Sequence, residues 1–420
     1  MRYDGSMPNP TPLYSQKDLP DTILDMVEGL DWCGLIEALK NGLPANLMSL
    51  GDVSLYERVL AELETSRPDR TTASLDAPMD LLEAFIDHGL ERGVFPEATM
   101  TAIGLACVYG QWKWIPRLIE AGFQIEGPAL GRSSVLHALI DGRYQRSFDY
   151  GDGNDGDDSR IPVGLPLSVD TLEEYENAAG MVALLAKQGA RLEDWDIDEE
   201  LGASKLTPLG RAVCVCDEAA VQGLLLAGAD LTALQQTEGF TGRPLDLAIM
   251  MGSDDTVKLL LGAGAPVDAN PGSPWLQSNP ARSLPLCLAA SIGRKEILED
   301  IIGEMDPHEL SEASVRALHL AACCNQLGAF TELLILGVPM DARTEANGFT
   351  PMHQAAMNGA TAVIDFLLEQ GVSWNVESTS GVPASATLLQ AQPHLAQRYG
   401  LQTAPTDNIR YLGLRRSMKR

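Results

Sequence analysis

Residues 348–375 read GFTPMHQAAMNGATAVIDFLLEQGVSWN and encode two short helices together with the residues that start and end them. Thr350 carries a hydroxyl that can cap a helix, and Pro351 follows at the first helical position, where a missing N–H costs nothing. Gly359 and Gly371 stand at the two helix ends, where a left-handed backbone favours glycine. Apolar residues between these signals recur at helical spacing. The stretch therefore predicts a pair of antiparallel helices.

The beginning of this stretch recurs along the chain. Residues 101–110, TAIGLACVYG, match residues 350–359 position by position. The proline slot recurs at separations of 36, 41, 32 and 34 residues, close to the period of about 33 residues typical of one kind of helical solenoid. The residues in that slot are Pro208, Pro244, Pro285, Ala317 and Pro351. Each unit of such an array buries its apolar face against its neighbours.

The motif Thr-Pro-Met-His at 350–353, the paired alanines at 355–356 and the two helix-ending glycines resemble the ankyrin repeat. The resemblance is closest over 203–380, weaker over 96–202 and weakest over 20–95. It implies an all-α fold, an ankyrin-repeat solenoid of about nine helix pairs with β-hairpin-like loops, here called fingers, and degenerate caps. In this family the fingers and the first helix of each pair line a concave groove that binds other proteins.

The resemblance and the composition together divide the chain into segments. We expect a flexible N-terminal arm at 1–19, degenerate helical repeats forming a cap at 20–95, ankyrin-like repeats at 96–202 with an acidic insertion rich in Gly and Asp near 143–176, regular repeats at 203–380, and a C-terminal cap with a basic tail at 381–420. Within the insertion, the carboxylates of DYGDGNDGDDSR lack the Asp-x-Asp-x-Asp-Gly spacing of a calcium loop, so we interpret it as a surface loop.

Charge restricts the class of partner. The 420 residues have a formal net charge of −28 and a pI near 4.5, which argues against nucleic acid or an anionic membrane and favours a basic protein. No run reaches the ~18 apolar residues that span a bilayer, and the N-terminus lacks the apolar core of a secretory signal. The seven cysteines lack framework spacing. We expect a cytoplasmic protein, with secretion as an effector left open.

The residues that could carry chemistry have structural explanations. His137, His319 and His353 occupy the histidine slot of the motif, and in ankyrin repeats that imidazole is a structural hydrogen-bonding group. By register, Cys214 and Cys323 occupy equivalent helix positions three repeats apart, so they cannot converge on one metal ion. No phosphate-binding loop, Gly-x-Ser-x-Gly elbow or His-Glu-x-x-His motif is present. We therefore predict no catalytic residue, no metal site and no cofactor.

Partner-binding residues are expected on the fingers and their surroundings. Aromatic and arginine side chains are favoured anchors at interfaces, and exposed carboxylates suit a basic partner. The candidates carried over by register are Trp112, Gln235, Glu238, Trp275, Asp341, Arg343, Glu345, Trp374 and Glu377. For Trp374 an alternative is that the ring packs between neighbouring fingers. Trp114, by contrast, is predicted to lie in the core.

These expectations lead to a non-enzymatic, monomeric interaction module that holds a basic protein in its groove. One concrete form is a stoichiometric inhibitor, such as an immunity protein or antitoxin that covers a basic toxin. The alternative is a bacterial secreted effector or adaptor that engages host proteins through its repeats. An enzyme hidden in 1–95 or in the insertion is disfavoured, because neither region shows a paired nucleophile and base.

Overall fold

The computed structural model describes most of the repeat array. The described residues are 21–45, 55–65, 76–88, 101–108, 112–125, 134–149, 172–198, 204–237, 240–269 and 284–401. The chain divides into two compact units, Met1–Gly239 and Phe240–Arg420, called here the N-terminal and C-terminal units. Trp275, Glu238 and the segments 1–19 and 402–420 lie outside the described residues.

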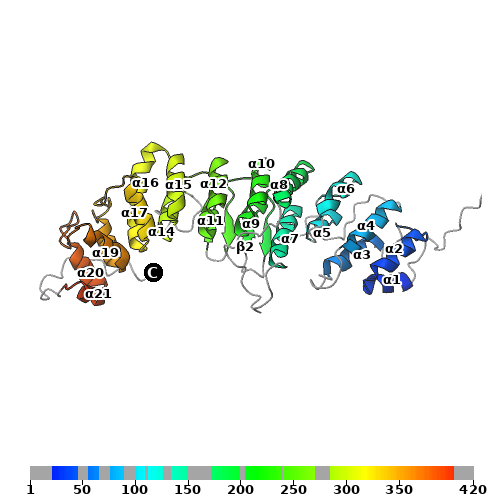
Figure 1. Ribbon diagram of the computed structural model, residues 1–420, viewed down its shortest axis with the longest axis horizontal. Coiled ribbons are helices and arrows are strands. Elements are labelled where there is room, and N and C mark those ends of the chain that lie inside the picture. Colours follow the sequence, from blue (N-terminus) through cyan, green and yellow to red (C-terminus); the bar gives the residue numbers. More distant parts are fainter. Residues whose placement is uncertain are drawn as a thin grey trace, which may run out of the picture. The chain divides into compact units, whose positions relative to one another are not determined.

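The N-terminal unit consists of five helix pairs and short strands among its described residues (Figure 1). The helices are α1 (Asp21–Glu28), α2 (Trp32–Lys40), α3 (Leu55–Thr65), α4 (Asp76–Asp87), α5 (Ala102–Val108), α6 (Ile115–Glu120), α7 (Val135–Asp149), α8 (Leu172–Lys187), α9 (Pro208–Cys214) and α10 (Glu218–Ala227). Strands β1 (Asp196–Asp198), β2 (Ser204–Leu206) and β3 (Gln235–Thr237) pair antiparallel, β1 with β2 and β2 with β3.

The C-terminal unit continues the pattern after a short strand β4 (Phe240–Gly242). Its helices are α11 (Pro244–Met251), α12 (Asp254–Gly262), α14 (Pro285–Ile292), α15 (Leu298–Glu304), α16 (Pro307–Cys323), α17 (Leu327–Ile335), α18 (Pro351–Asn358), α19 (Thr361–Glu369), α20 (Ala384–Ala391) and α21 (Pro393–Arg398). First helices pack on first helices, from α14 through α16 and α18 to α20, and second helices pack likewise from α15 through α17 to α19 (Figure 1). This architecture confirms the all-α solenoid.

The stretch 348–375 folds as its sequence predicts. Thr350 and His353 form a reciprocal capping box at the start of α18, and Gly359 ends that helix at φ 72° in the left-handed region. In α19, Val363 and Leu367 are fully buried. The alanines of α18 are also fully buried, and their small side chains let the neighbouring first helices approach closely. The core therefore lies between successive helix pairs.

Helix α16 differs from the expected repeat, in which a finger should precede a helix starting near Ala317. Instead one helix of 17 residues begins at Pro307. Asp306 caps it by accepting a hydrogen bond from the His308 N–H, and Pro307 occupies the first turn. No glycine interrupts Pro307–Cys323. The residues expected to form a finger are therefore part of the helix.

Two other expectations are corrected in the N-terminal unit. Helix α7 extends to Asp149 and helix α8 begins at Leu172, so both ends of the predicted insertion 143–176 are helical. Trp114 is half-buried rather than in the core, with its ring 5.6 Å from the guanidinium carbon of Arg117. It belongs to a 3-10 turn, which advances fewer residues per turn than an α-helix. Ile115, the next residue, is completely buried.

Helix α17 provides a test of the packing. Leu333 is completely buried, whereas Ile335 on the same helix is 76% exposed. We expect Leu333→Ala to lower the free energy of unfolding by about 2–5 kcal/mol, because it leaves a cavity between helix pairs. Ile335→Ala should change it by less than about 0.5 kcal/mol. Urea denaturation followed by circular dichroism measures both, and equal losses in the two variants would contradict this packing.

Candidate functional site

A histidine joins the start of α18 to the finger that follows it. His353 Nδ1 accepts hydrogen bonds from the Thr350 N–H (3.2 Å) and hydroxyl (2.8 Å), and its Nε2–H donates to the Val382 carbonyl (2.9 Å). The Phe349 ring stacks on the imidazole, with centroids 5.0 Å apart. His137 makes the same kind of link, from Ser134 to the carbonyl of Leu206. Both imidazoles act as structural bridges, as the sequence predicted.

His319 makes only half of this bridge. Its Nε2–H donates to the Ala342 carbonyl (3.0 Å), but the residue three positions earlier is Arg316, inside α16, where the His137 and His353 bridges have a hydroxyl. Among the described residues, its buried Nδ1 has no hydrogen-bond partner. Burial lowers the pKa of His319 to about 4, and the nearby His353 adds to that effect. Burial also lowers the pKa of His353. Both rings are therefore neutral at pH 7.

Two consecutive fingers of the C-terminal unit form one continuous surface. The first is 340–349 and the second is 374–382, and together they are called the finger pair. Arg343 Nη1 donates to the carbonyl of Gly348 (3.1 Å) and, across the gap, to that of Glu377 (2.8 Å). The Thr379 hydroxyl donates to the Asn347 carbonyl (2.8 Å). Gly348 has φ 63°, and a Cβ there would collide with Thr379. The fingers are thus fixed against each other.

The finger pair carries more negative than positive charge. Asp341, Glu345 and Glu377 are exposed, and Arg343 is the single basic residue within 340–349 and 374–382. The Arg343 guanidinium already donates to two backbone carbonyls. A surface of this kind attracts cationic side chains.

Trp374 packs on the C-terminal cap and is half-buried. Its ring centroid lies 5.3 Å from that of Tyr399, at an interplanar angle of 57°. The Tyr399 hydroxyl donates to Asp365 (2.8 Å), and Arg398 pairs with the same carboxylate (3.0 Å). The indole is therefore held by the cap. This arrangement is closer to the alternative in which the ring packs within the protein than to an exposed anchor for a partner. The ring packs on Tyr399, however, and not between neighbouring fingers as that alternative supposed.

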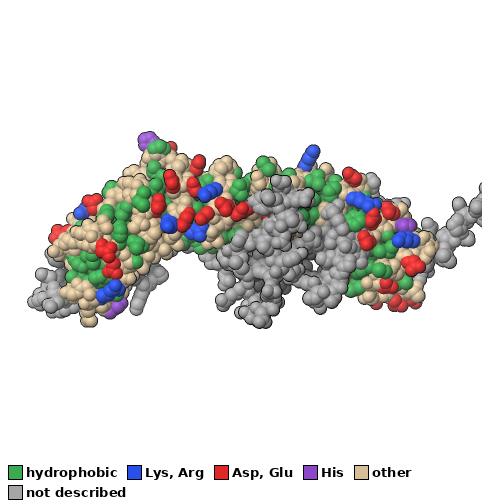
Figure 2. All heavy atoms as spheres, viewed as in Figure 1, with side chains coloured by type: hydrophobic (Ala, Val, Ile, Leu, Met, Phe, Trp, Pro, Cys, Tyr) green, Lys and Arg blue, Asp and Glu red, His purple; other side chains and the backbone are tan. Residues whose placement is uncertain are grey.

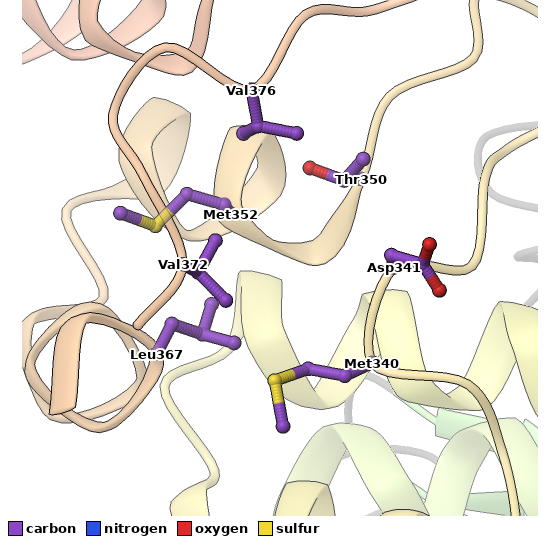
Figure 3. A pocket seen from close by; sticks show the side chains of 7 residues that line it. All are labelled: Met340, Asp341, Thr350, Met352, Leu367, Val372 and Val376. Carbon is purple, nitrogen blue, oxygen red and sulfur yellow. The ribbon is translucent and has the colours of Figure 1, made fainter. Parts of the chain in front are cut away.

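A small pocket lies at the base of the finger pair (Figure 3). It has a volume of about 120 Å³ and a mostly apolar lining drawn from both fingers and from α18 and α19. The lining residues are Met340, Asp341, Thr350, Met352, Leu367, Val372 and Val376. Among them, only Asp341 is a partner-binding candidate from the sequence. Thr350 is predicted as a helix cap, and the others follow the ordinary apolar pattern of a repeat, in which nothing distinguishes a gap from a filled core.

The structure brings five of the nine candidate residues together: Asp341, Arg343, Glu345, Trp374 and Glu377 all lie on the finger pair.

The remaining candidates lie elsewhere. Gln235 is completely buried in the N-terminal unit, where its Oε1 accepts from the Thr207 N–H (2.9 Å) and its amide donates to the Ala233 carbonyl (2.9 Å). It therefore joins neighbouring loops and is not available to a partner. Trp112 is half-buried in the 3-10 turn Trp112–Trp114. Glu238 and Trp275 fall outside the described residues.

Two of the cysteines are positioned for packing in the core. Cys107 and Cys287 are buried, and all seven cysteines of the chain are free thiols. Burial raises the pKa of Cys287 and of Cys214 to about 12, which keeps both thiols protonated and unreactive at neutral pH. Among the residues that the structure describes, no three His, Cys, Asp or Glu side chains are grouped closely enough to hold a metal ion. Within the same residues, no helix has both the length and the apolarity needed to cross a bilayer.

Two family models agree with the repeat pattern. Residues 243–270 match the family model for the ankyrin repeat, and residues 286–378 match the model for three copies of it. Glycerophosphocholine phosphodiesterase gde1 of Schizosaccharomyces pombe is 28% identical over 167 residues, 39% of this chain. The match spans 14% of that relative's length. The human ASB11 ankyrin repeat domain is 22% identical with a TM-score of 0.37, over 59% of this chain and 100% of that domain.

The incomplete bridge of His319 predicts a dependence of stability on pH. Because burial lowers its pKa from 6.5 to about 4, the unfolded chain takes up the proton first as pH falls. The contribution to stability is complete above about pH 6.5 and declines between pH 6.5 and 4, by on the order of 1 kcal/mol from pH 7 to pH 5. His319→Gln keeps a donor for the Ala342 carbonyl and should reduce this decline.

Urea denaturation midpoints at pH 7 and pH 5 measure the difference. His394 is exposed on α21, so His394→Gln is the matched control and should leave the pH dependence unchanged. If the decline with pH is as steep in His319→Gln as in the unaltered chain, another group is responsible.

Proposed function

Since the chain is an ankyrin-repeat protein, we propose that it binds a basic protein through the finger pair of its C-terminal unit and the adjoining groove. An ankyrin array is a protein–protein interaction module, and the proposal adds that the partner is basic. It rests on one observation above all: three exposed carboxylates, Asp341, Glu345 and Glu377, face solvent on two fingers that are locked together. The net charge of −28 makes the long-range electrostatic field of the whole chain negative, like the local charge of these carboxylates.

The role proposed for this binding is stoichiometric inhibition in the cytoplasm, for example by an immunity protein or antitoxin that covers a basic enzyme. Charge supports it, and free cysteines are in keeping with a reducing compartment. The phosphodiesterase named above is matched over only 14% of its length. Its activity is therefore not assigned to this chain, and we propose a non-catalytic role.

Affinity purification from native cells, followed by mass spectrometry, identifies the partner. We expect a basic protein at one-to-one stoichiometry, with an association rate that falls as salt is raised, because the attraction is screened. The triple reversal Asp341→Lys, Glu345→Lys and Glu377→Lys should weaken binding at least tenfold, as measured by surface plasmon resonance.

A control of equal charge separates the finger pair from the general field. Acidic side chains also cover the second helices, and Figure 2 shows them over α12 and α15. The reversal of Glu299, Glu304 and Glu369, all exposed on α15 and α19, changes the net charge by the same amount. It should alter affinity by less than about threefold. Equal losses in the two triple variants, or capture of no basic protein, would refute the assignment.

A further inference from the structure

The pocket at the base of the finger pair is an apolar space that the fold leaves unfilled. Met352 of α18 and Leu367 of α19 are buried beneath it, while Met340, Val372 and Val376 are each only partly buried. The pocket therefore reaches the surface at the finger side chains. Its volume is about 120 Å³, and an engineered apolar cavity of about 150 Å³ holds benzene. The space consequently suits one aliphatic side chain of the size of leucine.

A carboxylate stands beside this apolar space. Asp341 belongs to the pocket lining and is exposed. In Figure 3 its carboxylate points away from the other lining side chains, so the charge lies next to the apolar space and not inside it. Among the described residues, no hydrogen bond or ion pair involves its side chain. The neighbouring Arg343 makes no direct ion pair with it, and its Nη1 donates to the carbonyls of Gly348 and Glu377. The first finger thus presents an apolar space and an unpaired negative charge side by side.

From this combination we propose that the pocket takes a leucine or methionine side chain of the partner and that Asp341 pairs with a lysine or arginine next to it in the partner's sequence. The inference rests on the proposed function, because the same finger pair meets the partner. It adds a local motif, an aliphatic residue beside a basic one, to a partner otherwise defined only by its net charge. Anchor residues that fill small pockets carry much of the energy of an interface.

The size of the pocket and the position of the charge discriminate between ligands. An alanine leaves most of the apolar space empty, and a tryptophan exceeds it. An acidic neighbour meets Asp341 with Glu345 a few residues further along the same finger, and like charges in contact are repelled. Both properties of the motif are therefore needed, and each can be removed separately in a small probe.

Methionine methyl groups report directly on the pocket. We would label the full chain with ¹³C at the methionine methyls and assign the Met340 and Met352 signals with Met340→Leu and Met352→Leu. Titration with acetyl-leucyl-arginine amide should shift these two signals in a saturable way. Acetyl-alanyl-arginine amide and acetyl-leucyl-glutamate amide are the matched probes, and each should bind at least fivefold more weakly.

Two variants test the two halves of the site. Val376→Phe fills the pocket and should abolish the shifts. Asp341→Asn preserves the shape of the side chain and removes its charge. It should weaken binding of the leucyl-arginine probe at least threefold, and it should not weaken binding of the leucyl-glutamate probe. Since Val376→Phe could also disturb folding, its circular dichroism spectrum is compared with that of the unaltered chain, and Asp341→Asn keeps the test valid if they differ. Absent shifts, or equal shifts with all three probes, overturn the proposal.

The remaining outcomes are also decisive. If a basic partner is captured equally well by the unaltered chain, Asp341→Asn and Val376→Phe, the proposed function stands and the pocket is not used. If the probe binds but no basic partner is captured, the pocket assignment stands and the proposed function fails. The chain itself contains the pair Leu414–Arg415. If the substitution Leu414→Asp shifts the Met340 and Met352 signals in the absence of any probe, the occupant is this chain's own segment. The proposal of a partner residue is then overturned.

Discussion

The contact on which the fingers depend is the hydrogen bond from a buried imidazole to the backbone of the next finger. In His353 one ring nitrogen accepts from the helix start and the other donates to Val382, so a single side chain fixes both the beginning of α18 and the position of the second finger. A charged ring could not accept at Nδ1, and burial keeps the pKa low. Folding of this surface thus requires the neutral histidine, which leaves no ring nitrogen for catalysis.

Where the imidazole link is reduced, the architecture changes as well. At His319 the hydroxyl found at the His137 and His353 bridges is replaced by Arg316, and the finger before it is replaced by the first half of α16. The two changes have one cause, because a residue inside a continuous helix cannot also cap the start of that helix. The repeat before the finger pair therefore presents helix instead of loop. Within 284–401, the finger pair is the part of the surface built by adjacent fingers.

Helix pairs, their glycine ends and the histidine bridges could be predicted because each depends on residues close in sequence. The outcome at the surface depended on contacts between repeats, which local patterns do not encode. Gln235 was expected to face solvent, but Thr207, 28 residues earlier, supplies a donor that holds it inside. Trp374 was predicted from exposure of the loop, and its ring instead meets Tyr399 of the cap. The pocket escaped prediction because apolar residues that leave a gap look the same as those that fill one.

The only basic residue of the finger pair, Arg343, forms hydrogen bonds to backbone carbonyls and, within the described part of the chain, no ion pair with the carboxylates around it. Arg343 Nη1 donates to the carbonyls of Gly348 and Glu377, and these hydrogen bonds join the two fingers. Two residues away, the Asp341 side chain is exposed and forms no ion pair with any residue that the structure describes. A carboxylate in that position gains most from an external cation, especially beside an apolar pocket where bound groups exclude water and reduce screening. The surface whose shape this contact sets therefore presents exposed carboxylates, and this is the physical basis of the proposal that its partner is basic.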